Sequence, residues 1–153
     1  MRIMVARIPE EGSPYKGDDP GSIMELGDDP AVKGVGDVQY ELYAQLVSDE
    51  LVVRGTLLLG LDLKCARCSE FFSTTVADSD FLRAYPASKD TESVDITADM
   101  REDLLLHIPA FPVCGEGCRG LCAQCGVDLN KSPCDCEVGE RPNPWSALDN
   151  LDL

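Results

Sequence analysis

Six cysteines crowded into one short stretch constrain this chain more than any other feature of its sequence. The stretch reads C-x3-C-x3-C-x2-C-x8-C-x-C from Cys114 to Cys136, and a separate C-x-x-C pair lies upstream at Cys65 and Cys68. A two-residue gap places two sulfurs on one tight turn, which is what a tetrahedral zinc ion requires from each half of a four-thiolate site. Gly126 follows a C-x-x-C pair, where such a turn commonly needs positive φ. The pattern predicts zinc.

Disulfide bonds and thiol redox chemistry are the alternatives to a metal. The chain opens MRIMVARIPEEG, which lacks the apolar core of a signal peptide, and no stretch approaches the roughly 18 apolar residues of a membrane helix. We therefore expect a cytoplasmic protein without membrane contact, in which thiols stay reduced and clustered cysteine pairs are typical of metal or redox sites. A thioredoxin-like role is less favoured, because no helix pattern begins directly after Cys68 to lower a thiol pKa.

The spacing also predicts how the eight cysteines divide between two sites. The loop between Cys125 and Cys134 closes at low entropic cost, whereas joining Cys68 to Cys114 requires the tertiary fold. The predicted ligands of one zinc ion are Cys122, Cys125, Cys134 and Cys136, and those of a second are Cys65, Cys68, Cys114 and Cys118. We expect one or two zinc ions. Four thiolates leave no open position for water, so a hydrolytic zinc is disfavoured.

Acidic residues dominate the charge of the chain. It carries 28 Asp and Glu against 13 Lys and Arg, a formal net charge of −15. Because nucleic-acid affinity depends largely on Lys and Arg at phosphates, this balance favours docking on a basic protein over RNA as the main contact, and nothing predicts a small-molecule substrate. The most basic stretch makes Arg54, Lys64 and Arg67 candidate RNA contacts, although solvated strand-edge side chains are the simpler explanation.

Hydrophobic periodicity predicts an α+β fold. Residues 38–46 and 51–63 alternate or run apolar like strands, and residues 48–50 supply a turn, so we expect a hairpin. Residues 71–81 continue it as a third antiparallel strand. Residues 97–107 form the best helix candidate, with apolar residues at four-residue spacing facing the sheet and a proline shortly after the last turn.

We expect two regions along the chain. Residues 1–113 form an antiparallel meander packed by one main helix, with residues 9–37 as an irregular loop because they are rich in Gly, Pro and Asp. Residues 114–153 form a cysteine-rich, zinc-ribbon-like tail packed on the same domain. A short helix that opens near Pro144 ends this tail.

Enzyme activity is not expected from these residues. A nuclease requires carboxylates gathered around a hard metal ion. Asp95, Asp99, Glu102 and Asp103 are close in sequence, but acids at a helix start explain most of them without catalysis. His107 is the only histidine, so no catalytic triad can be argued, and we expect it to be a packed or capping residue. A thiol redox enzyme or a nuclease stays the alternative class.

Several motifs occur in an order that resembles the bacterial and plastid YceD family. They are CARCSEFF, EDLLLHIPAFPVC, CRGLCAQCGVDLN, CDC and RPNPWSALDNL. The resemblance covers roughly residues 38–151. Members are called large ribosomal RNA subunit accumulation proteins. The resemblance implies a non-catalytic ribosome-biogenesis factor that supports accumulation or processing of large-subunit (23S) ribosomal RNA. A zinc-stabilised interaction module unrelated to ribosomes is the alternative.

The resemblance also carries over to individual cysteines. Cys65 and Cys68 match the family's first cysteine pair, and the last four cysteines match a later set that some members lack. This variability implies a metal that supports structure and not a shared reaction. The implied partners are a pre-ribosomal large subunit or a basic ribosomal protein.

Overall fold

The structure, a computed structural model, describes residues 1–88 and 90–136. Its elements in chain order are β1 (Arg2–Met4), η1 (Val5–Arg7), β2 (Ser13–Asp19), η2 (Gly21–Met24), β3 (Val32–Val47), β4 (Glu50–Lys64), β5 (Phe71–Pro86), β6 (Ser93–Asp95) and α1 (Thr97–His107). The described residues are mostly antiparallel sheet with one α-helix, so the predicted α+β class is confirmed. Within the same residues, no helix has the length and apolar character needed to cross a membrane.

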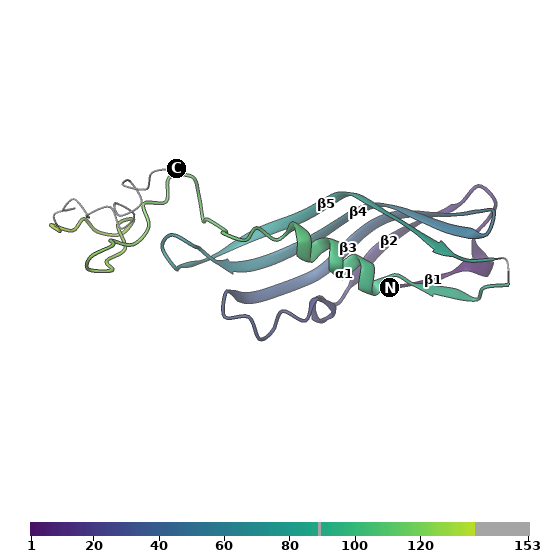
Figure 1. The fold of residues 1–153 in the computed structure, drawn as a ribbon, viewed down its shortest axis with the longest axis horizontal. Coiled ribbons are helices and arrows are strands. Elements are labelled where there is room, and N and C mark those ends of the chain that lie inside the picture. The colour runs from purple at the N-terminus through teal and green to yellow at the C-terminus, as the bar shows by residue number, and fades with distance from the viewer. Residues whose placement is uncertain (89, 137–153) are drawn as a thin grey trace, which may run out of the picture.

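The main sheet is a four-stranded antiparallel meander with the order β2-β3-β4-β5 (Figure 1). The β3–β4 hairpin turns at Ser48 and Asp49, and Ser48 adopts a positive φ of 55°, where the sequence predicts the turn. Side chains alternate across a strand, so every second residue of β4 can enter the core. Those buried are Leu51, Val53, Leu57, Leu59, Leu61 and Leu63. The predicted hairpin is confirmed.

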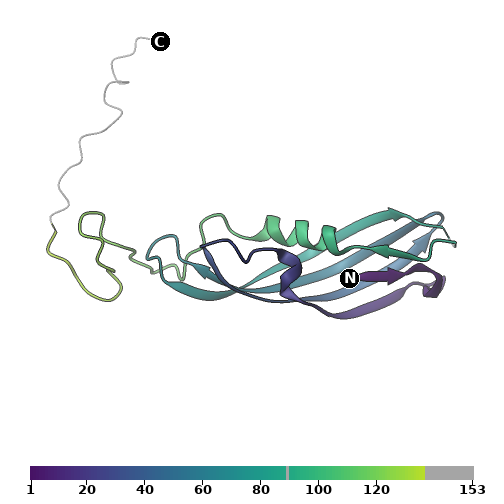
Figure 2. The same cartoon turned by 90° about the horizontal axis from the view of Figure 1, so that it is seen from below.

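One face of this sheet is covered by α1, which spans the residues that the sequence predicts (Figure 2). Ile96, Met100 and Leu104 are fully buried against the sheet, as their four-residue spacing predicts. Arg83 of β5 pairs with Asp103 of α1, which adds a charged contact between the two layers. The short strands β1 and β6 pair beside the start of the helix. The resulting core cluster runs from residue 3 to residue 104.

Residues 9–37 are not the irregular loop that their composition predicts. Residues 13–19 form β2, which pairs in register with β3 from Ser13 opposite Ala44 to Asp19 opposite Val38. Proline and glycine are tolerated here because β2 is an edge strand, bonded to a single neighbour. The chain then passes through η2 and enters β3 already at residue 32.

The third strand is longer than predicted, because β5 continues beyond residue 81 to Pro86. Gly55 pairs with Phe81 and Leu57 with Asp78, so β5 contains one more residue than β4 between these pairs. Such a bulge moves the buried positions from even to odd numbers along the strand. Val76 and Asp78 are buried before it and Phe81 after it.

The cysteine-rich segment lies at one end of the long sheet (Figure 1). It consists of turns and irregular loops with one isolated bridge between Leu121 and Asp128. It touches the sheet region at the β4–β5 connection, where the amide of Ala66 donates to the carbonyl of Pro112 at 2.7 Å. The short helix predicted near Pro144 lies outside the described residues.

Candidate metal centres

Four sulfurs from two distant segments meet at the end of the sheet. Cys65 and Cys68 lie on the β4–β5 connection, and Cys114 and Cys118 follow α1. The four sulfurs lie within 4.8 Å of one another, with 3.9 Å between Cys65 and Cys118 and 3.8 Å between Cys68 and Cys114. Zn–S bonds of about 2.3 Å separate the sulfurs of a tetrahedral site by about 3.8 Å, whereas a disulfide joins them at about 2.05 Å. This group, which we call site A, fits a shared ion and not disulfides.

The remaining cysteines form a second group, site B. It comprises Cys122, Cys125, Cys134 and Cys136, whose sulfurs also lie within 4.8 Å of one another. Among the residues that the structure describes, sites A and B are the groups of three or more His, Cys, Asp and Glu side chains placed to hold a metal ion. Their membership is the division that the spacing predicts. Each group can enclose one ion in a shell of four sulfurs, and zinc as that ion stays a prediction.

The C-x-x-C pairs of the two sites fold into the same turn, a knuckle. In site A, the amide of Ser69 donates to the carbonyl of Cys65 at 2.9 Å; in site B, the amide of Gly126 donates to the carbonyl of Cys122 at 2.9 Å. A further amide, two residues after the first cysteine, points at its sulfur at 3.4 Å in both knuckles. Ser69 and Gly126 occupy equivalent positions, with φ of 61° and 74°. The two turns therefore present their sulfurs in the same way.

This equivalence predicts opposite effects of two substitutions. A residue with a Cβ costs about 1 kcal/mol or more in the left-handed region, which glycine enters freely. Gly126→Ala should therefore weaken zinc binding at site B, and Ser69→Gly should strengthen it at site A, each by about 1 kcal/mol. Competition with a chromogenic chelator measures both. Equal affinities in wild type and Gly126→Ala would contradict the shared turn geometry.

The electrostatics of site A favour a cation among its sulfurs. Burial opposes ionisation of Cys65, but the backbone amides of Cys68, Cys114 and Arg67 outweigh it and lower the pKa of Cys65 to about 6. The neighbouring side chain of Cys118, followed by that of Cys65, raises the pKa of Cys114 to about 12. The protein alone therefore favours one thiolate here and opposes another, because crowded negative charges repel.

Site B repeats this division. The backbone amides of Cys125 and Gln124 lower the pKa of Cys122 to about 6. In contrast, the side chain of Cys125 and burial raise the pKa of Cys136 to about 12. A divalent cation removes the repulsion, since a coordinated thiol gives up its proton. Both groups of sulfurs could thus hold a metal ion.

The three candidate RNA contacts do not form one basic patch. Arg54 lies in β4 with its guanidinium 5.7 Å from the centre of the Tyr43 ring. Lys64 ends the same strand, which at about 3.3 Å per residue puts it roughly 33 Å away. Arg67 lies on the site A knuckle and donates to two carbonyl oxygens of the Glu116–Cys118 segment at 3.3 and 3.2 Å. Arg67 therefore holds the loop of site A.

Three of the four acidic residues considered for a nuclease have structural partners. Asp95 accepts a hydrogen bond from the first amide of α1 at 3.0 Å, and Asp99 accepts one from the Tyr85 hydroxyl at 2.8 Å. Asp103 pairs with Arg83. Glu102 is exposed. In the described part of the chain, these side chains join no group that is placed to hold a metal ion.

His107 is exposed at the end of α1, where its side chain contacts a backbone carbonyl as a capping residue does. Its Nδ1 lies 2.8 Å from the carbonyl oxygen of Asp103, and its Nε2 lies 3.9 Å from Asp78. Within the described residues it belongs to neither metal site.

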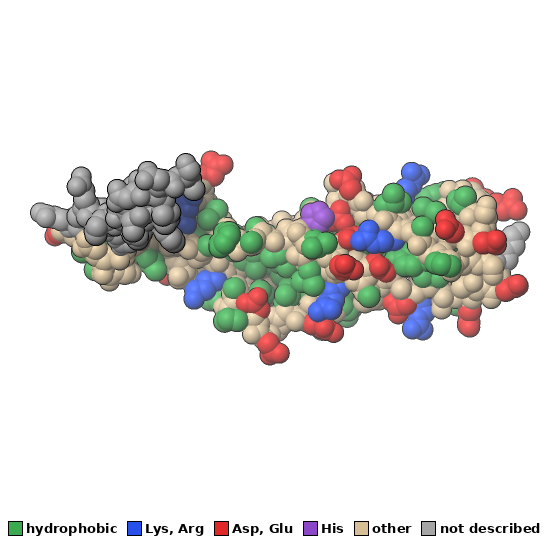
Figure 3. Space-filling view, in the orientation of Figure 1, with side chains coloured by type: hydrophobic (Ala, Val, Ile, Leu, Met, Phe, Trp, Pro, Cys, Tyr) green, Lys and Arg blue, Asp and Glu red, His purple; other side chains and the backbone are tan. Residues whose placement is uncertain are grey.

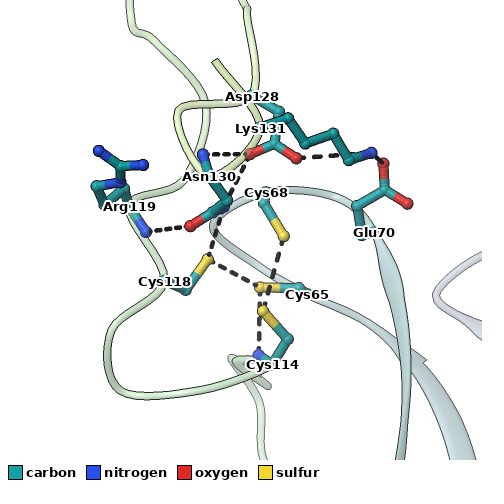
Figure 4. A network of polar contacts seen from close by, with 9 residues as sticks. All are labelled: Cys65, Cys68, Glu70, Cys114, Cys118, Arg119, Asp128, Asn130 and Lys131. Atoms are coloured by element: carbon teal, nitrogen blue, oxygen red, sulfur yellow. Dashed lines mark hydrogen bonds and ion pairs between the residues drawn. The ribbon is translucent and has the colours of Figure 1, made fainter. Parts of the chain in front are cut away.

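Sequence reasoning missed the polar residues that join the two sites. Asn130, in the loop of site B, donates from its side-chain amide to the sulfur of Cys118 in site A at 3.5 Å (Figure 4). The other residues of this network are Glu70, Arg119, Asp128 and Lys131. The sequence feature that could have pointed to Asn130 is the GVDLN motif, which ends at this residue.

Comparison with known proteins supports the family resemblance that the sequence motifs indicate. A family model described as "Large ribosomal RNA subunit accumulation protein YceD" matches residues 53–152, which include all eight cysteines. The chain is 34% identical over 62 residues to the large ribosomal RNA subunit accumulation protein YCED homolog 1, chloroplastic, of Arabidopsis thaliana, covering 40% of this chain and 19% of that protein. It thus spans about a fifth of that relative. No solved structure matches.

Two mycobacterial proteins match over more of the chain. An uncharacterized protein of Mycobacterium tuberculosis is 32% identical over 158 residues, covering 87% of this chain and 72% of its own length. An uncharacterized protein of Mycobacterium leprae is 29% identical over 124 residues, covering 72% and 56%. Because the family model spans well over half of the sequence, this chain belongs to the YceD family of large ribosomal RNA subunit accumulation proteins.

Proposed function

We propose that this protein is a non-catalytic, cytoplasmic factor that supports accumulation of large-subunit (23S) ribosomal RNA during ribosome assembly. The observation that carries the proposal is the family match, which spans both cysteine sites, all of β5 and most of β4. The family is named for accumulation of the ribosomal RNA and not for a reaction. Asp95, Asp99 and Asp103 also have structural partners, which explain these acidic side chains near α1 without catalysis.

In this proposal each cysteine site holds one zinc ion in a structural role. Support comes from sulfur separations of 3.8 and 3.9 Å in site A, which match the edges of a zinc–thiolate tetrahedron. In site B the four sulfurs lie within 4.8 Å of one another. When bound, the ion would fix the knuckles and so shape the surface at the end of the sheet. The cysteine-rich segment would then act as a zinc-ribbon-like module.

The proposed partner is the pre-ribosomal large subunit, met mainly through a basic ribosomal protein. Acidic side chains are spread along the face in Figure 3 and gather at the end of the sheet farthest from the cysteine-rich segment. With a formal net charge of −15, the protein is attracted to a basic protein and repelled by bare RNA at long range.

The best candidate for a secondary RNA contact is the end of the sheet beside the cysteine-rich segment. Lys64 ends β4 opposite Phe71, which is 43% exposed. Lys33 lies over the same ring, with 5.8 Å between its Nζ and the ring centre. A cation pair beside an exposed aromatic ring suits an unpaired nucleotide, which combines a phosphate with a flat base.

Gradient sedimentation tests the proposal. We expect the protein in cell lysate to sediment with large-subunit precursors at low salt and to leave them as salt rises, because charge drives the contact. Cells that lack the protein should show a lower ratio of 23S to 16S ribosomal RNA. Pull-down with RNase-treated and mock-treated arms shows whether the contact depends on RNA. Protein found only at the top of the gradient at low salt, with an unchanged RNA ratio, would refute the proposal.

A further inference from the structure

The side chain of Asn130 links site B to a ligand of site A. Its Nδ2 donates to the sulfur of Cys118 at 3.5 Å, and its Oδ1 accepts a hydrogen bond from the amide of Arg119 at 2.8 Å (Figure 4). Cys118 is a member of site A, whereas Asn130 lies between Cys125 and Cys134 of site B. One side chain from the loop of site B therefore contacts both a ligand of site A and the peptide that follows it.

The position of Asn130 depends on the conformation of the site B loop. Asp128 accepts hydrogen bonds from the backbone amide of Asn130 at 2.9 Å and from its side-chain Nδ2 at 2.8 Å. The amide of Leu129 donates to the carbonyl of Gly120 at 2.9 Å, which fastens the loop to the segment between the two sites. The loop is closed at its two ends by Cys125 and Cys134, two members of site B. Asn130 is therefore in place when site B is formed.

The same loop also touches the other half of site A. The ammonium of Lys131 pairs with Glu70, which directly follows the site A knuckle. In the spacer between the sites, the amide of Leu121 donates to the carbonyl of Arg67 at 3.0 Å. The site B region thus contacts the Cys65–Cys68 knuckle as well as Cys118, so it spans both segments that build site A.

From these contacts we infer that Asn130 is a positioning residue through which site B raises the metal affinity of site A. The inference rests on the zinc binding proposed above. An amide that donates to a metal-bound sulfur orients the ligand and stabilises its negative charge, and loss of such a partner typically costs about 10- to 100-fold in metal affinity. Because binding free energies are reciprocal, a filled site A favours site B by the same factor.

Zinc titration against a competing chelator tests the coupling in the full chain. Cys122→Ser/Cys125→Ser removes site B, and the affinity of the remaining site A should fall about 10- to 100-fold. Asn130→Ala should cause a similar fall at site A with site B still able to bind zinc. Adding Asn130→Ala to the site B double variant should cause little further loss, because both changes break the same connection.

Two further variants separate a role toward sulfur from a general effect on the loop. Asn130→Asp keeps an acceptor for the Arg119 amide but loses the donor to Cys118 and adds a negative charge beside it, so it should bind zinc at site A no better than Asn130→Ala. Glu102→Gln removes one negative charge from an exposed side chain of α1, which belongs to neither site, and should match wild type. The core cluster ends at Leu104, so all variants should keep the sheet region folded, which circular dichroism checks.

The results distinguish this inference from the zinc proposal. Two zinc ions in wild type and weakened binding at site A in both the site B and Asn130→Ala variants would support the coupling. Two zinc ions in wild type with an unchanged site A in the site B variant would overturn the coupling and leave the zinc role intact. A wild-type protein without zinc would overturn both. Full rescue by Asn130→Asp would also overturn the role of the amide as a sulfur donor.

Discussion

Replacing Cys68 with serine should remove one zinc ion and open the contact between the sheet and the cysteine-rich segment. Cys68 is 5% exposed, and its sulfur lies 3.8 Å from that of Cys114. A serine hydroxyl is a poor replacement for a thiolate ligand, and structural zinc contributes about 10–16 kcal/mol in small zinc domains. After purification in excess zinc, we expect the metal content to fall from two ions to one. The amides of Ala66 and Leu121 should exchange with solvent about 100-fold faster or more.

Cys122→Ser in site B is the matched control for this substitution. It also should cost one zinc ion, but site A stays filled in excess zinc, so the hydrogen bond from Ala66 to Pro112 should stay protected. Mass spectrometry of the intact protein counts the ions, and hydrogen exchange locates the change. Two ions retained in Cys68→Ser, or equal exposure of Ala66 in both variants, would show that Cys68 does not hold the segment to the sheet.

The elements with one clear period were predictable from sequence. In β4 the buried residues fall on every second position. Ile96, which precedes α1, and Met100 and Leu104 within it are buried at every fourth position. Turn-forming residues lie between β3 and β4, and Pro109 follows α1. In each case the local pattern and the tertiary environment agree, so the local pattern was sufficient.

The elements that were missed lack such a period. β2 is an edge strand bonded to β3 alone, and its side chains alternate between half-buried and exposed. Pro14, Gly17 and two aspartates can therefore occupy it, and its composition is that of a loop. In β5 the bulge between Asp78 and Phe81 changes which positions are buried, so an alternating pattern appears to end there. Both elements are determined by pairing with a neighbouring strand, and a short stretch of sequence does not reveal such pairing.

In the metal sites too, the features set by local spacing were predictable and those set by the tertiary fold were not. The eight cysteines divided correctly into groups because ligand spacing and loop closure limit the choices. Asn130 was not singled out, since an asparagine in a polar loop is ordinary in sequence and acquires its contact with Cys118 only when the two sites lie side by side.

Gly55→Ala should destabilise the main sheet strongly. Gly55 has a φ of 153°, which residues with a side chain rarely adopt, and an added Cβ would lie 2.1 Å from the carbonyl oxygen of Glu41 and 2.8 Å from the Cα of Leu42. Both contacts are with the backbone of β3, which cannot move without breaking its pairing with β4. We expect a loss of about 3 kcal/mol or more in the free energy of unfolding and a fall of roughly 6 to 12 °C in Tm.

Gly60→Ala on the same strand is the matched control, because it also replaces a glycine with alanine but creates no steric clash. An added Cβ at Gly60 would meet no atom within 4 Å, and alanine restricts the unfolded chain more than glycine does. The free energy of unfolding of Gly60→Ala should therefore equal that of wild type or exceed it by up to about 1 kcal/mol. Thermal and urea denaturation of the zinc-loaded proteins give both values. A Gly55→Ala protein as stable as Gly60→Ala would mean that β3 and β4 do not approach each other at Gly55 as closely as the structure has them.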